Sequence, residues 1–130
     1  MIAVIFEVWP AEGARQSYLD IAAALRADLV EIDGFISVER FQSLTEPDKM
    51  LSLSFWRDEE AIRQWRNLPN HRRAQNKGRG DKGRGDKGHA GIFRDYRLRI
   101  AEVARDYGLT ERAQAPGDSR QAHAPIGLSI

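Results

Sequence analysis

Few side chains in this 130-residue chain could do chemistry on their own. There is no cysteine, which excludes disulfides, thiolate metal sites and cysteine nucleophiles. The three histidines, His71, His89 and His123, have no ligand-like spacing relative to one another, so no metal site is expected. His71 is a candidate for proton transfer, but it lies in the polar run NHRR, where an exposed histidine with ordinary titration is the alternative.

The most unusual stretch is a tandem repeat, NKGRGDKGRGDKGHAG, at residues 76–91. Its glycines follow no predicted strand and lack the lysine and hydroxyl pairing of a phosphate-binding loop. Each copy contains Arg-Gly-Asp, which resembles the adhesion signal read by integrins, but duplication of a short coding repeat or an engineered insertion explains the same letters. We interpret residues 77–90 as a glycine-rich surface loop inserted between a helix and the last strand.

Charge and hydropathy exclude several classes of partner. The net charge is +1, and the basic residues concentrated between Arg57 and Arg99 are not interleaved with aromatic residues in the loop, so no nucleic acid is expected as a partner. The apolar start MIAVIFEVWP lacks a basic leader, contains Glu7 and is too short for a signal peptide or membrane span. The expectation is a cytoplasmic protein without a membrane partner.

Hydrophobic periodicity predicts the elements that would position a site. Two strands, 35–43 and 49–56, are joined by the turn-forming TEPDK and read as an antiparallel hairpin. Before them come a β-branched strand ending at Pro10 and an amphipathic helix over 14–30 that ends before Gly34. After them, Asp58 is a predicted N-cap of a second helix, which Pro69 interrupts.

The segment 91–103 has two interpretations. Alternating apolar residues favour a fourth strand, whereas the steps from Tyr96 to Tyr107 also fit a helix. If it is a strand, Tyr96 and Arg97 face opposite sides and only one of them reaches a given pocket. Residues 108–130 contain few large apolar groups and are expected to form a C-terminal arm or tail.

The order of elements predicts an α+β fold of the ferredoxin-like split βαβ type (βαββαβ), with a four-stranded antiparallel sheet and two helices on one face. The strands carry apolar residues on both faces, although helices would cover only one. A homodimer or higher homo-oligomer in which two sheets meet, a dimeric α+β barrel, would cover the other face.

Four segments resemble the antibiotic biosynthesis monooxygenase family: EVWP, IDGFISVERFQS, SFWRDEEAIRQWRNLPNHRRAQ and FRDYRLRIAEVARDYG. The likeness spans roughly residues 2–107 and places one domain of this kind at 1–107. Without residues 79–88, the join QNKGHAGIF has the helix-to-strand spacing of an ordinary member, which supports an insertion.

For cofactor-free oxygenases, the resemblance implies a pocket that binds a flat polyphenolic or quinol-type substrate without a cofactor. It implies His71 as proton acceptor, Tyr96 as a second catalytic group and Arg72 or Arg97 as the stabilising charge. The aromatic walls would then be Trp65, Phe55 and Trp56. Simple core packing is the alternative role for the tryptophans.

Haem degradation, found in another branch of the family, is disfavoured. That branch implies a histidine ligand near positions 74 and 75, where this chain has Ala74 and Gln75, and an asparagine in the first strand, where it has none. Two classes of function stay open. One is a monooxygenase, and the other is a non-catalytic ligand-binding or assembly protein with the repeat as an interaction or engineered loop.

Overall fold

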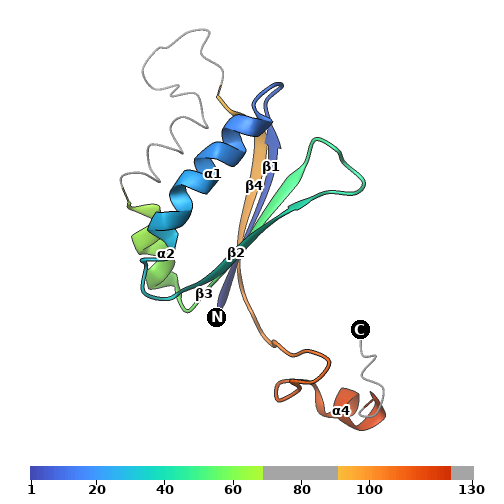
Figure 1. The fold of residues 1–130 in the computed structure, drawn as a ribbon. Helices are drawn as coiled ribbons and strands as arrows, with labels where there is room; N and C mark the ends of the chain where they lie inside the picture. Colours follow the sequence, from blue (N-terminus) through green and yellow to red (C-terminus); the bar gives the residue numbers. More distant parts are fainter. Residues whose placement is uncertain (69–90, 124–130) are drawn as a thin grey trace.

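The computed structural model describes residues 1–68 and 91–123, with side chains described up to residue 120. Figure 1 shows a sheet with two helices on one side and a C-terminal segment that extends away from it. The elements in chain order are β1 Ile2–Pro10, α1 Arg15–Leu29, β2 Phe35–Gln42, β3 Met50–Trp56, α2 Glu59–Arg66, β4 Phe93–Glu102 and α4 Gly117–His123.

The four strands form one antiparallel sheet in the order β2-β3-β1-β4, which confirms the ferredoxin-like fold predicted from the sequence. The first strand lies in the middle and pairs with the last, so that Ile2 faces Glu102 across the ladder. The helical interpretation of residues 91–103 is therefore wrong. Pairing with β1 over most of its length decides in favour of a strand.

A glycine turn follows the end of α1, and a side-chain cap marks the start of α2. Gly34 has φ +96° in the turn between α1 and β2, a conformation that glycine adopts without strain. The Asp58 carboxylate accepts a hydrogen bond from the Ala61 backbone N–H at 3.0 Å and caps α2, as the sequence predicts. Glu59 and Glu60 in the first turn complement the helix dipole.

β3 has an unusual distribution of side chains. In its sequence MLSLSFW, Met50, Ser52, Ser54 and Trp56 are all buried. The residues between them, Leu51, Leu53 and Phe55, point to the opposite face and are only partly buried. Ser52 and Ser54 thus face α1 and α2 between Met50 and Trp56, and Leu51, Leu53 and Phe55 face away from the helices.

The buried residues between sheet and helices form two separate clusters. One contains Val8, Tyr18, Met50 and Ile92, and the other contains Leu29, Trp56, Ala61 and Ile62. Trp56 is 1% exposed and packs edge-on against Phe35 with ring centroids 5.2 Å apart. The division into two clusters leaves space between them.

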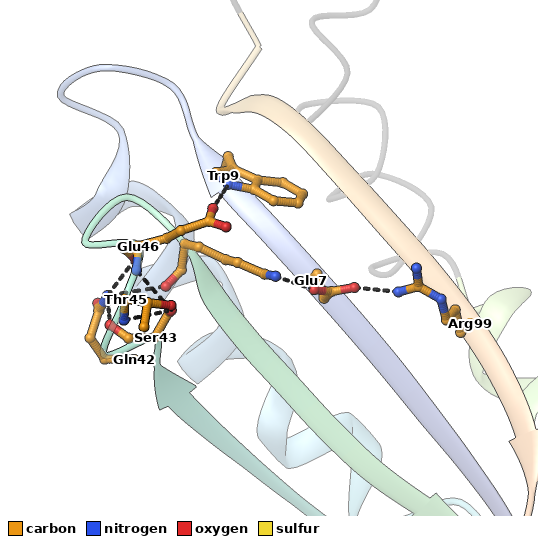
Figure 2. A network of polar contacts seen from close by, with 8 residues as sticks. Glu7, Trp9, Gln42, Ser43, Thr45, Glu46 and Arg99 are labelled. Atoms are coloured by element: carbon orange, nitrogen blue, oxygen red, sulfur yellow. Dashed lines mark hydrogen bonds and ion pairs between the residues drawn. The ribbon is translucent and has the colours of Figure 1, made fainter.

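Ion pairs join three strands on the sheet face opposite the helices. Glu7, in β1, pairs with Lys49 next to β3 and with Arg99 in β4 (Figure 2). The Glu7 side chain is only 19% exposed. The Lys49 ammonium also lies 5.2 Å from the Trp9 ring centroid, and the Trp9 indole donates a hydrogen bond to Glu46 at 3.1 Å in the β2–β3 loop.

The C-terminal segment has more structure than the composition of residues 108–130 predicts. It contains helix α4, and Ala115 is 2% exposed. Several side-chain hydrogen bonds connect members of this same segment, for example the Asp106 N–H with Gln114 at 2.8 Å. Figure 1 shows the segment leaving the sheet at the end of β4.

In the described part of the chain, no helix has the length and hydropathy needed to cross a membrane.

Candidate functional site

A cavity of about 250 Å³ lies between the sheet and helices α1 and α2. Two cross-strand rows form its floor, and the strand registers fix their membership. The first row runs Arg40, Ser52, Phe6, Leu98 and the second runs Val38, Ser54, Val4, Ile100, each from β2 through β3 and β1 to β4. Serines at the β3 positions make room where larger residues would fill the space.

The two helices supply the roof. The α1 residues recur at helical steps, as the sequence predicts, and α2 contributes residues near its C-terminal end. These roof residues are Tyr18, Ile21, Ala22, Leu25, Leu29, Ile62, Trp65 and Arg66. Both buried clusters contribute to the lining, so the cavity occupies the space between them.

Three of the sequence-predicted site residues come together in this cavity. Trp56 and Trp65 line it with ring centroids 6.4 Å apart, and Tyr96 lines it from β4 at 41% exposure. The Tyr96 ring lies 5.7 Å from that of Phe6 and 5.8 Å from that of Phe93. An aromatic wall therefore follows β1 and β4.

Two other predicted residues do not line the cavity. Phe55 and Arg97 alternate with cavity-lining neighbours and therefore lie on the opposite face of the sheet. This differs from the walls and charge expected from the resemblance. Tyr96, not Arg97, is the member of that adjacent pair which reaches the pocket.

His71, Arg72 and the repeat at 77–90 lie outside the described residues. The described chain reaches the cavity immediately on both sides of this gap, since Arg66 and Ile92 both line it.

The sequence interpretation missed five polar residues of the cavity: Tyr18, Arg40, Ser52, Ser54 and Arg66. The Arg40 Nε donates a hydrogen bond of 3.4 Å to the Tyr18 hydroxyl, and the guanidinium carbon lies 5.9 Å from the ring centroid. One available signal was the strand pattern, because Arg40 shares the phase of Val38 in β2 and must share its face.

The described residues with shifted pKa do not line the cavity. Hydrogen bonds from Lys49, then Arg99, hold the pKa of Glu7 below its ordinary value of 4.5. A hydrogen bond from Arg57, then the Ala61 N–H, lowers the pKa of Asp58, and Arg63 lowers that of Glu60. Over the described ranges, no three histidine, aspartate or glutamate residues are grouped so that they could hold a metal ion.

Comparison with known proteins agrees with the fold and identifies the family. Residues 1–77 match the family described as antibiotic biosynthesis monooxygenase. The chain is 45% identical over 103 residues to the jasmonate monooxygenase ABM of Pyricularia oryzae, an alignment that covers 79% of this chain. It spans only 43% of that relative's length.

Solved structures share the architecture at low identity. A Deinococcus radiodurans protein, described as a candidate monooxygenase of this family, superposes with TM-score 0.65 at 13% identity, covering 85% of this chain and 99% of its own. Rv0793 of Mycobacterium tuberculosis gives 0.60 at 17% identity, with 81% and 96% covered. These likenesses establish the fold, and the match over residues 1–77 establishes the lineage: the chain belongs to the antibiotic biosynthesis monooxygenase family.

Proposed function

We propose that this protein is a monooxygenase that oxidises a small, largely apolar molecule in the cavity between sheet and helices. The observation that carries the proposal is the cavity itself, which is not filled by side chains and is walled by Phe6, Trp56, Trp65 and Tyr96. Pockets of roughly 300–1,000 Å³ accept drug-sized ligands, so a cavity of about 250 Å³ suits a smaller one.

The number of electrons that the reaction requires limits the possible classes of substrate. Conversion of a CH₂ group to C=O by one O₂, with release of water, needs no external reductant, because the substrate supplies all four electrons. An easily deprotonated polyphenol or quinol precursor can supply them, which is the substrate class that the family resemblance implies. Insertion of one oxygen into an isolated C–H bond needs two further electrons from a reductant.

The name of the Pyricularia oryzae relative suggests the second kind of substrate. A jasmonate is a small apolar molecule with one acidic group, and its size is compatible with this cavity. The two substrate classes therefore differ in a measurable way, namely in whether turnover depends on an added reductant.

Oxygen uptake and product mass test the proposal. The purified chain is incubated with an anthrone, a hydroquinone or jasmonic acid, each with and without a reduced nicotinamide cofactor. We expect uptake with at least one substrate and a product that carries one oxygen from ¹⁸O₂. No uptake with any of these substrates, in any arm, would leave a binding protein as the better interpretation.

A matched pair of substitutions on α1 locates the reaction. Ala22 is 6% exposed and lines the cavity, whereas Ala24 is exposed on the same helix and is not part of the lining. Ala22→Leu should fill the cavity and lower kcat/KM at least tenfold, while Ala24→Leu should leave it unchanged. Equal effects of the two substitutions would place the reaction elsewhere.

We also propose that the chain works as a homodimer. The sheet face without helices carries Leu51, Leu53 and Phe55, and Phe41 beside them is 41% exposed. A face of this kind gains free energy when a second sheet covers it. The molar mass from sedimentation decides this point, and a monomeric mass at micromolar concentration would contradict the pairing.

A further inference from the structure

The polar end of the cavity has hydrogen-bond donors without matching acceptors. Among the cavity-lining residues the charged ones are Arg40 and Arg66, and no aspartate or glutamate accompanies them. Within the described residues, neither guanidinium lies within ion-pairing distance of a carboxylate. The cavity therefore carries positive charge that the described chain does not neutralise there.

Arg40 is the better placed of the two arginines. It is partly buried, whereas Arg66 is exposed. A guanidinium has five N–H donors. The structure gives Arg40 one side-chain hydrogen bond, to the Tyr18 hydroxyl, and at 3.4 Å it is long. Most of the donor capacity of Arg40 is therefore available to a molecule in the cavity.

One hydroxyl group contacts this guanidinium, and a second belongs to the residue opposite Arg40 in the sheet. Tyr18 is 6% exposed and uses its oxygen to accept from Arg40, which leaves its own O–H free to donate. Ser52 is 9% exposed and is the cross-strand partner of Arg40, on the same face of the sheet. Its hydroxyl makes no side-chain hydrogen bond with another described residue.

The second serine of the cavity floor, Ser54, differs from Ser52 in its hydrogen bonding. The Ser54 hydroxyl accepts a hydrogen bond from the Trp56 indole at 2.9 Å, so it already has a partner inside the protein. Arg40, Tyr18 and Ser52 have donors left over and lie together, while the rest of the lining is mostly apolar or aromatic. A bound anion would satisfy these donors, and a carboxylate matches the planar fork of an arginine.

We infer that Arg40, with Tyr18 and Ser52, forms an anchor for the carboxylate of an amphiphilic organic acid whose apolar body lies toward Trp56 and Trp65. The inference assigns organic acids as the class of ligand for the cavity. Only the further step, that the bound acid is the substrate, rests on the proposed function. The binding itself is independent of oxygen chemistry.

Calorimetric titration tests the anchor with three naphthalene probes of the same body. These are 2-naphthoate, its neutral amide 2-naphthamide, and 2-naphthol, which represents a phenolic head group. Since a charge-assisted hydrogen bond contributes about 1.5–3 kcal/mol, wild type should bind the naphthoate about tenfold to hundredfold more tightly than the amide. The naphthol should bind no more tightly than the amide.

Substitution of Arg40 should remove this preference without removing the cavity. In Arg40→Met the naphthoate should lose its advantage while the amide keeps its wild-type affinity, which also shows that the variant is folded. Arg40→Lys should retain part of the preference, because it keeps the charge and loses the fork. Arg26→Met removes an exposed charge on α1 outside the cavity and should change neither affinity.

Three results would overturn the inference. They are equal binding of naphthoate and amide by wild type, an unchanged preference in Arg40→Met, or no saturable naphthoate binding at millimolar concentration. A preference for the naphthol would instead assign the site to phenols. Anion binding without any oxygen uptake would contradict the proposed monooxygenase activity and leave the anchor in place.

Discussion

At the scale of single residues, Arg40 and Glu7 show how the same kind of charge has different consequences on the two sides of the sheet. Glu7 is paired with Lys49 and Arg99, so its charge is compensated within the described chain. Arg40, on the other side, has the neutral Tyr18 hydroxyl as its only polar side-chain partner among the described residues. The paired charge of Glu7 therefore stabilises the sheet, whereas the charge of Arg40 in the cavity, unpaired by any described carboxylate, is available to a ligand.

The depressed pKa of Glu7 predicts a pH-dependent contribution to stability. Because folding favours the ionised form, this contribution is present above the ordinary pKa of 4.5 and is lost as pH falls through the lower pKa of the folded state. Glu7→Gln should therefore melt a few degrees lower than wild type at pH 7, and the difference should shrink as the pH is lowered below 4.5.

Circular dichroism melting curves at several pH values measure this difference. Glu39→Gln is the matched control, because Glu39 is an exposed carboxylate in β2 without an ion pair in the described chain. It should melt like wild type throughout. A Glu7→Gln deficit that stays constant down to the lowest pH at which wild type still folds would mean that packing, not charge, is lost.

At the scale of elements, the turn between α1 and β2 fixes where α2 lies. The Gly34 carbonyl accepts a hydrogen bond from the Arg57 N–H at 2.7 Å. A Cβ built on Gly34 would lie 2.9 Å from the Ala61 Cβ in the first turn of α2. Position 34 therefore requires glycine for two reasons: the backbone has a positive φ, and a Cβ would collide with Ala61.

A graded set of alanine substitutions separates these two requirements. Gly34→Ala combines strain and collision and should lower the free energy of unfolding by about 1–3 kcal/mol or more. Gly13→Ala has only the strain, since φ is +75° and its surroundings are open. Gly108→Ala has neither and should be neutral. Urea unfolding measures all three, and a Gly34→Ala effect no larger than that of Gly13→Ala would exclude the collision.

The elements were largely predictable from the sequence, and the site was predictable only in part. Periodicity gave α1 and the capped start of α2, because burial on one face of a helix imposes a repeat. The same rule put Tyr96 on the opposite side from Arg97. It could not say which face of β3 meets the helices, since Leu51 and Leu53 suggest the wrong one. Phe55 was expected in the site from the family resemblance alone, and the alternation of the strand places it on the other face.

At the scale of the whole molecule, the fold joins distant parts of the chain around one cavity. Ile2 pairs with both Trp56 and Glu102, so the central strand needs the hairpin and the last strand to complete the sheet. The structure describes the chain up to Leu68 and again from Gly91. The strand pairings that define the described sheet all join residues outside the repeat.

Removal of the repeat should therefore leave the fold intact. Deletion of residues 79–88 takes away less than half of the connection between α2 and β4. Because loop-closure entropy changes by only about 0.6 kcal/mol per doubling of length, stability should shift by less than that amount. Naphthoate affinity should be unchanged, because the described cavity residues all remain.

Replacement of residues 79–88 by ten alternating glycines and serines is the control for length. Equal stability of the deleted, replaced and wild-type proteins would fit an insertion without a structural role. Loss of folding in both altered proteins would show that the repeat supports the domain.

The alternation of serine and leucine in β3 has a consequence for how this protein balances stability against use. Successive strand residues face opposite sides, so a shift of β3 by one position would exchange Leu51 and Leu53 with Ser52 and Ser54. In the shifted register Met50 and Trp56 would also leave the helix side, and leucines would replace the serines in the floor beneath the helices. The space between sheet and helices thus depends on the register of β3 as well as on its composition. Substitutions that fill this space to gain stability would remove the volume that a ligand needs.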